Sequence, residues 1–368
     1  MYRLQRSLYG LKQSPRCWNK RIDDFLVKYG FKISEADPCL YIMIKNDVKM
    51  LLALYVDDGI IASSSEEEVQ KLITDLQTEF KIKHKAADYF LGLEIQENKE
   101  GIKVTQVAYT RKLLEKFNMY ECKPVSSPIL KDENPQSRKA PDSVNENKKF
   151  PYREAVGSLM YLMTGTRPDI AYAVGVVSRN LDNYSESDVI KVKRIFRYLK
   201  GTCDLGITYK RNFKQGILEG YSDADLGGDV QTGRSTSGVV YIYSGGAISW
   251  TSKRQTSVAI STTEAEVVAA SEGAREAVWL KRLLQEITEF KTATLFVDNN
   301  AAIKIAENPV WHKRTKHIAI RHFFIREKVQ EGELEIKRVS TSDQLADGLT
   351  KPLPNTQISK LNQYLGLG

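Results

Sequence analysis

The sequence predicts a mixed α/β and α+β chain in which acidic residues lie at the edge of a sheet. Two apolar runs, 217–223 and 294–298, have the β-branched and aromatic composition of short strands, and each ends on an aspartate. From Thr262 apolar residues recur at helical spacing, which predicts a long amphipathic helix. Apolar runs on either side of an Asp-Asp-Gly turn signal predict a β-hairpin over 50–61.

Length and composition indicate a soluble protein with more than one domain. The 368 residues, 42% hydrophobic and 27% charged, suffice for two or three domains with hydrophobic cores. The net charge of +8 suits a polyanionic partner, although many soluble proteins carry as much. The N-terminus lacks a signal-peptide pattern, and the longest apolar run, 50–56, is too short to cross a membrane. We expect a soluble intracellular protein, in the cytoplasm or nucleus, without a membrane partner.

The four cysteines are scattered and include no C-x-x-C pair. This spacing is typical of reduced thiols and argues against a disulfide framework or a zinc site. The residues are Cys17, Cys39, Cys122 and Cys203.

Residues 1–130 are predicted to alternate between helices and strands. An amphipathic helix ends near Gly30, a residue type that stops helices, and 34–41 opens a strand. Ser64 is the expected N-cap of a helix over 64–80, whose first turn is rich in glutamate. A strand and then a helix follow over 104–117.

A change in composition follows this part of the chain. Residues 131–149 are polar, contain two prolines and have almost no aliphatic side chains, which predicts a linker or loop. Residues 150–201 are predicted to be helical again. A basic helix within them carries Lys193, Arg194 and Arg197, and such a face is either solvated or in contact with phosphates.

Four acidic signals recur between residues 220 and 351, where apolar runs meet breaks. Asp223 and Asp298 stand at strand ends, Glu264 at the start of the long helix and Asp347 in a later break. Carboxylates that converge repel one another, and one takes up a proton unless a cation lies between them. Magnesium resolves this conflict because it prefers oxygen ligands, and a pair of such ions can support phosphodiester hydrolysis.

Each acid also has a purely structural explanation. The pattern Ser261-x-x-Glu264 is a capping box, so the whole role of Glu264 could be to close a helix N-terminus. Asp298 could cap the following helix, and Asp223 and Asp347 could be solvated surface acids. The four acids together, in this order, indicate a catalytic site more specifically than any one of them does alone.

The spacing of six motifs points to a family. The runs 220–225, 234–238, 261–266, 297–303, 314–318 and 346–353 closely resemble, in order and spacing, the ribonuclease H domain of copia-type retrotransposon Pol polyproteins. This resemblance implies an RNase H-like mixed sheet with flanking helices over 216–353 and a C-terminal tail over 354–368. It implies that two Mg²⁺ ions, with Mn²⁺ as a substitute, are held by Asp223, Glu264, Asp298 and Asp347, with Asp225 and Glu266 as neighbours. The substrate would be an RNA–DNA hybrid.

The chain departs from the family pattern at three positions. Leu226 stands where the family usually has tryptophan, and Ala319 and Phe323 also differ from the usual residues. These differences concern packing or substrate contacts rather than the four acids.

The N-terminal part resembles the same family's reverse transcriptase. A two-residue Asp-Gly turn forms on backbone grounds alone, but 7–18, 55–58 and 89–95 resemble successive landmarks of that enzyme. The resemblance implies a partial palm over 1–130, with Asp57 and Asp58 as metal ligands and Lys12 and Gln13 near the nucleotide or template. It also implies a helical thumb or connection over 150–215, with Lys193, Arg194 and Arg197 near duplex phosphates.

One part of the polymerase is not found. The family needs a further aspartate from an earlier palm strand, and Asp23, Asp24, Asp37 and Asp47 all lack its sequence context. The fingers are also absent. We therefore expect a reading frame that begins inside the polymerase domain and has lost polymerase activity, unless an N-terminal Pol portion completes it in trans.

A basic segment with three histidines lies near the C-terminus. His312, His317 and His322 are spaced by five and cannot share one helix face, which argues against a zinc site. Phosphate contacts are instead expected from Lys313, Arg314, Lys316 and Arg321. The predicted function is RNase H cleavage of RNA–DNA hybrids, and the alternative is a catalytically silent nucleic-acid-binding remnant of a transposable element.

Overall fold

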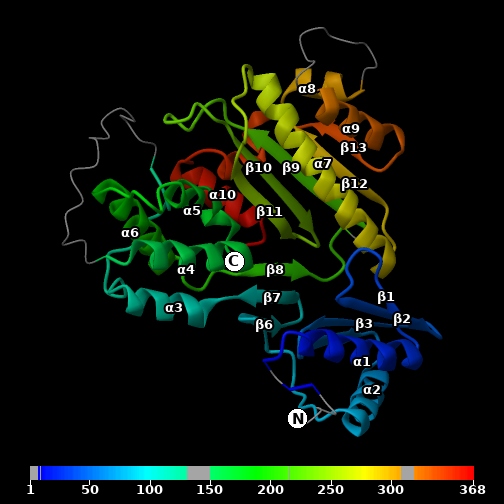
Figure 1. The fold of residues 1–368 in the computed structure, drawn as a ribbon. Helices are drawn as coiled ribbons and strands as arrows, with labels where there is room; N and C mark the ends of the chain where they lie inside the picture. The colour runs from blue at the N-terminus through cyan, green and yellow to red at the C-terminus, as the bar shows by residue number, and fades with distance from the viewer. Residues whose placement is uncertain (1–6, 9, 131–149, 215, 308–318) are drawn as a thin grey trace, which may run out of the picture. The chain divides into compact units, whose positions relative to one another are not determined.

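The computed structural model describes residues 7–8, 10–130, 150–214, 216–307 and 319–368, without the side chains of 305–307 and 319–320 (Figure 1). The predicted linker over 131–149 and the basic residues Lys313, Arg314 and Lys316 lie outside these residues. The chain divides into two compact units. The first comprises 1–91 with 282–289, and the second 92–281 with 290–368.

The first unit is an antiparallel sheet packed against two helices. The strands, in sheet order, are β1 (Lys32–Ile33), β2 (Leu40–Lys45), β3 (Val48–Tyr55) and β4 (Asp58–Ser63), the helices are α1 (Ser14–Tyr29) and α2 (Glu66–Glu79), and β5 (Tyr89–Phe90) follows. Gly30 ends α1 with φ 119°, as predicted. The N-cap of α2 is Ser65 rather than Ser64, because the Ser65 side chain accepts a hydrogen bond from Glu68 N. Leu26, Met50 and Leu72 lie in the common core.

The predicted hairpin is confirmed, but its turn does not lie at Asp58-Gly59, which belong to β4. Strands β3 and β4 pair up to Tyr55 and Asp58, which leaves Val56 and Asp57 as a two-residue turn.

The second unit begins with a small sheet and a helical layer. Its elements are β6 (Leu93–Glu97), β7 (Gly101–Thr105), α3 (Val107–Lys116), α4 (Tyr152–Gly165), η2 (Pro168–Ile170), α5 (Ala171–Ser178), α6 (Glu186–Gly201) and β8 (Ile207–Lys210). Strands β6, β7 and β8 pair in this order, all antiparallel. The predicted strand and helix over 104–117 and the helices over 150–201 are therefore confirmed.

A five-stranded mixed sheet forms the rest of the second unit, to which α7 (Thr262–Ile287) belongs up to residue 281. Its elements are β9 (Ile217–Ala224), β10 (Thr236–Tyr243), β11 (Gly246–Arg254), α7 (Thr262–Ile287), β12 (Thr292–Val297), α8 (Asn300–Glu307), α9 (Ala319–Gln330), β13 (Glu335–Arg338), η4 (Thr341–Asp343), η5 (Leu345–Leu349) and α10 (Asn355–Tyr364). The strand order is β11-β10-β9-β12-β13. Strand β9 is antiparallel to β10 and parallel to β12, and β12 is parallel to β13. The predicted mixed sheet with flanking helices is confirmed.

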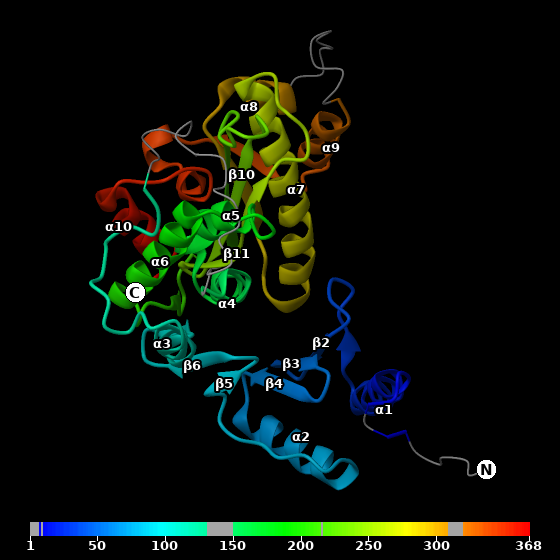
Figure 2. The ribbon, with the colours of Figure 1, turned by 60° about the vertical axis from the view of Figure 1, so that its left-hand side comes forward.

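Helices cover both faces of this sheet (Figures 1 and 2). Alternate residues of β10 show the two sides, since side chains on a strand point alternately to opposite faces. The Tyr241 hydroxyl donates to Gly273 O of α7, 2.9 Å away. Val240 and Ile242 instead share a hydrophobic cluster with Ala171 of α5 and Leu361 of α10.

This cluster joins parts of the second unit that are distant in the sequence. Ile207 from β8, Leu349 from η5 and Leu365 after α10 belong to the same cluster. The helical layer, the mixed sheet and the last residues of the chain therefore share one core. Residues 92–281 and 290–368 accordingly form one compact unit, which includes the positions 215/216 and 353/354. Leu367 even forms a β-bridge with Ile207.

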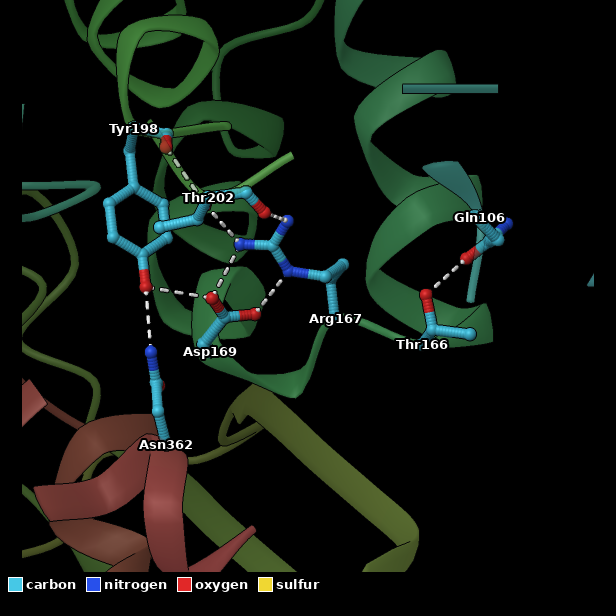
Figure 3. Close-up of polar contacts among 7 residues, drawn as sticks. All are labelled: Gln106, Thr166, Arg167, Asp169, Tyr198, Thr202 and Asn362. Atoms are coloured by element: carbon cyan, nitrogen blue, oxygen red, sulfur yellow. Dashed lines mark hydrogen bonds and ion pairs between the residues drawn. The ribbon is translucent and has the colours of Figure 1, made fainter. Parts of the chain in front are cut away.

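A buried ion pair joins three helical segments of this layer (Figure 3). The Arg167 guanidinium, 1% exposed, donates Nε and Nη2 to the Asp169 carboxylate at 2.9 and 2.7 Å. It also donates to Thr202 O at the end of α6. The Tyr198 hydroxyl donates to Asp169 and accepts from Asn362 of α10. Each buried charge is thus paired and hydrogen-bonded, as such groups require.

Among the helices of the described ranges, none combines the length and apolarity needed to cross a lipid bilayer.

Candidate active site

Two of the predicted acids meet because their strands are parallel neighbours. Asp223 is the penultimate residue of β9, and Asp298 directly follows β12. Tyr221 pairs with Phe296, so both aspartates stand two residues beyond the same pair at one edge of the sheet. Thr341 Oγ1 donates to Asp298 Oδ2 at 3.2 Å, which orients that carboxylate.

Asp223 is held from the other side by the segment that contains η5. The Thr350 hydroxyl donates to Asp223 Oδ2 at 2.5 Å. This approach depends on Gly238, which pairs with Asp223 on β10. A Cβ at position 238 would lie 2.8 Å from Ala346 O and from side-chain atoms of Leu349 and Thr350. The absence of a side chain there lets the segment reach the acidic edge.

The third carboxylate comes from Glu266 on α7. Asp223, Glu266 and Asp298 each place one carboxylate oxygen within 4.8 Å of the other two, the one such group among the described residues. Glu266 is buried, and its Oε2 has no hydrogen-bond partner. An unpaired buried carboxylate oxygen next to two others is costly unless a cation or a proton meets it.

Glu264, one of the predicted ligands, is not a member of this group of three. Its backbone N–H donates to Ser261 Oγ at 3.2 Å, and its Oε2 accepts from Ile260 N at 2.8 Å. This is the helix-closing role that Ser261-x-x-Glu264 allowed. Residues two apart on a helix point about 200° apart, so Glu264 and Glu266 cannot both face the sheet edge. The capping box was the signal that could have identified Glu266. If Glu264 closes the helix N-terminus, Glu266 is the remaining glutamate that can face the sheet edge.

Asp347 lies next to the three carboxylates without being one of them. It is part of η5, and its Oδ1 is 2.8 Å from Lys351 Nζ. Its negative charge nevertheless contributes to raising the pKa of Asp223 and of Glu266.

Burial and mutual repulsion raise the pKa values of the three carboxylates. Burial is the main cause that raises the pKa of Glu266 to about 9, followed by the charges of Asp223 and Asp298. Burial likewise raises the pKa of Asp223, against the lowering effect of the Thr350 hydrogen bond. The pKa of Asp298 is raised by burial and then by the charge of Asp223. Three hard oxygen ligands, one of them without a partner, fit a divalent ion such as Mg²⁺.

The polymerase-type aspartates lie in the first unit and are exposed. Asp57 lies in the turn of the β3–β4 hairpin, and Asp58 is the first residue of β4, paired with Tyr55. Trp18 Nε1 donates to Val56 O at 2.6 Å, which fixes this turn against α1. Lys12 and Gln13, at the start of α1, are exposed as well. Within the described residues, no further acid joins Asp57 and Asp58 to form a group of three.

The predicted phosphate-binding side chains have different surroundings. Arg194 Nη2 donates to Ser127 Oγ and Arg197 Nε donates to Lys123 O, both at 2.8 Å. These two arginines therefore connect α6 to the segment 123–127. Lys193 is exposed, with its Nζ 5.7 Å from the centre of the Phe150 ring. Arg321 is half-buried on α9.

Two of the three departures from the family pattern can be located. Leu226 and Phe323 are exposed, so neither fills the core. The side chain of Ala319 lies outside the described residues.

Known proteins resemble the chain over nearly its whole length. The reverse transcriptase (RNA-dependent DNA polymerase) family model matches residues 1–131. The retrovirus-related Pol polyprotein from transposon TNT 1-94 of Nicotiana tabacum is 40% identical over 99% of this chain, which spans 28% of that polyprotein. A Ty5-1 transposon protein of Saccharomyces cerevisiae is 30% identical over 75% of this chain and 89% of its own length.

The fold also matches a solved structure. The foamy viral protease-reverse transcriptase in complex with RNA/DNA hybrid has 12% identity and a TM-score of 0.50, over 91% of this chain and 39% of that one. At this identity the likeness concerns the fold alone. The chain spans about a quarter of the length of the plant Pol polyproteins that it matches.

Proposed function

This chain belongs to the copia-type family of retrovirus-related Pol polyproteins from transposons, and we propose that it is a Pol fragment that hydrolyses the RNA strand of RNA–DNA hybrids. The observation that carries the proposal is the convergence of Asp223, Glu266 and Asp298 within 4.8 Å at one edge of the mixed sheet. The buried, unpartnered Oε2 of Glu266 favours a cation at this place.

We assign the metal-binding role to Asp223, Glu266 and Asp298, with Asp347 as an additional acid beside them. Two Mg²⁺ ions, for which Mn²⁺ can substitute, would supply an activated water and stabilise the leaving oxygen. Thr350 and Thr341 orient the carboxylates of Asp223 and Asp298 by hydrogen bonds. Glu264 serves as a helix cap in this proposal.

A nucleic-acid duplex is the proposed substrate. The foamy viral reverse transcriptase was solved with an RNA/DNA hybrid, and this chain shares its fold and carries a net charge of +8. Phosphates of the duplex would be met by basic side chains outside the acidic edge, among which Lys193 is exposed.

Cleavage of a labelled hybrid tests the proposal. With Mg²⁺ we expect the full chain to cleave the RNA strand and the Asp298→Asn variant to lose this activity. Asp204→Asn is the matched control, because that aspartate is exposed and paired only with Arg111 on the surface. Equal cleavage by the Asp298→Asn variant and the wild type would count against the enzyme. Hybrid binding without any cleavage would support the alternative, a silent nucleic-acid-binding remnant.

We further propose that this chain does not synthesise DNA on its own. The family match over 1–131 favours a polymerase ancestry, but Asp57 and Asp58 lack a third acid among the described residues. A phosphoryl-transfer site needs its full set of metal ligands. Primer extension on a primed RNA template tests this, and robust synthesis would refute it. Synthesis that begins only when an N-terminal Pol portion is added would indicate completion in trans.

A further inference from the structure

A lysine is fixed beside the acidic edge by the turn that follows η5. The backbone N–H groups of Thr350 and Lys351 both donate to Asp347 O, at 3.1 Å. Lys351 Nζ then lies 2.8 Å from Asp347 Oδ1. Two consecutive residues thus hold two different carboxylates, because the Thr350 hydroxyl binds Asp223.

The Lys351 charge acts beyond its direct partner. The ammonium also favours the ionised forms of Asp223 and Asp298. The lysine side chain is 46% exposed, whereas that of Asp347 is 14% exposed. A flexible four-carbon stem that is half in solvent can move its charge away from the acids without disturbing the core.

We propose that Lys351 is a built-in counter-ion of the acidic edge, which neutralises the carboxylates before a divalent cation binds and competes with that cation afterwards. The inference rests on the proposed function, since it concerns the same site. Lys351 is a positioning residue here, because it acts through Asp347 and the neighbouring carboxylates. Removing its charge should tighten divalent binding, whereas structural damage would weaken it.

The chain offers a matched control for this charge. Lys360 pairs with Asp343 at the same Nζ–Oδ1 distance of 2.8 Å, and its side chain is 45% exposed. Lys360→Met therefore removes a lysine charge from an ion pair of the same length outside the acidic group, where the carboxylate partner, Asp343, is 58% exposed. Lys351→Arg keeps the charge at the site and tests whether any effect of Lys351→Met comes from charge or from shape.

The experiment measures Mn²⁺ binding to the full chain by calorimetry at low salt, with thermal unfolding in EDTA as the second readout. We expect Lys351→Met to bind Mn²⁺ about tenfold more tightly, the effect of one unit charge on a divalent ion about 6 Å away in a water-like dielectric. Without metal, the same variant should unfold at a lower temperature than Lys360→Met. Lys351→Arg should bind within about twofold of the wild type, because its charge is kept.

The possible outcomes separate the two proposals. Three outcomes would overturn the counter-ion role and leave the nuclease proposal intact. They are unchanged or weaker Mn²⁺ binding by Lys351→Met, an equal tightening of Mn²⁺ binding by Lys360→Met, and equal melting temperatures of these two variants without metal. Failure of the wild type to bind Mn²⁺ would overturn both.

Discussion

The choice between two glutamates on one helix gives the sharpest test of the site. Glu266→Gln removes one of the three carboxylates that lie within 4.8 Å of one another, and Glu264→Ala removes the side chain that accepts from Ile260 N. We expect Glu266→Gln to lower the rate of hybrid cleavage by about 10²–10³-fold, roughly 3–4 kcal/mol of transition-state stabilisation. Glu264→Ala should leave the rate within about threefold of the wild type.

The stabilities of the two variants should follow the reverse order, with little change in Glu266→Gln and a loss in Glu264→Ala. Because the pKa of Glu266 is raised to about 9, its side chain is protonated at pH 7 without metal, and glutamine is a neutral mimic of that form. Metal-free Glu266→Gln should therefore unfold within about 1 kcal/mol of the wild type. Glu264→Ala keeps the Ser261 cap on the backbone but loses the hydrogen bond from Ile260 N, which costs about 1 kcal/mol and lowers the melting temperature by about 3 °C.

The assay is single-turnover cleavage of a labelled hybrid at saturating Mg²⁺, with calorimetric unfolding of each variant in EDTA. If Glu264→Ala were as inactive as Glu266→Gln while still folded, Glu264 would be a ligand and the geometric assignment would be refuted. Full activity of Glu266→Gln would refute it equally.

Three further predictions concern the buried ion pair, pH and the close approach at the sheet. Arg167→Met should destabilise the protein by about 3–5 kcal/mol in urea unfolding, because it leaves the buried Asp169 unpaired. Arg153→Met, whose arginine is 68% exposed, should cost less than about 1 kcal/mol. Similar losses of stability in both variants would contradict the claim that burial decides the contribution of the ion pair. The folded-state pKa of Glu266 is raised to about 9 from its usual 4.5, so between these two pH values the native state holds a proton that the unfolded state has lost. The free energy of unfolding without metal should therefore fall as the pH rises from 4.5 to about 9. The same pH dependence in thermal unfolding of Glu266→Gln would show that it does not come from Glu266. Gly238→Ala should slow the cleavage of the hybrid, because the added methyl group pushes Thr350 away from Asp223. A rate equal to that of the wild type in the cleavage assay would show that the segment containing Thr350 moves without affecting Asp223.

Local patterns in the sequence were sufficient for much of the fold. The strands ending on Asp223 and next to Asp298, the helix that starts at Thr262 and the hairpin that carries Asp57 and Asp58 all follow from periodicity and turn chemistry. These features depend on neighbours along the chain, so a single sequence contains the information. The same is true of the Gly30 helix stop.

Long-range packing decided features that no local pattern in the sequence predicts. The basic helix face predicts phosphate contacts for Arg194 and Arg197, and the structure adds that both donate hydrogen bonds to the segment 123–127. Residues 354–368 were expected to be a tail, yet they complete a core that includes Ala171 and Ile207. Neither partner lies within a few turns of the residue in question, so no local pattern could reveal it.

The acidic edge shows the division between the two kinds of information. By itself the sequence determined that carboxylates stand at the ends of β9 and β12 and at the start of α7, because strand ends and helix caps are encoded locally. Only the tertiary structure decided that Glu266 faces Asp223 and Asp298 while Glu264 closes the helix. The physical reason is the rotation of α7 about its own axis, which is set by the packing of the helix against the sheet and not by the spacing of the glutamates.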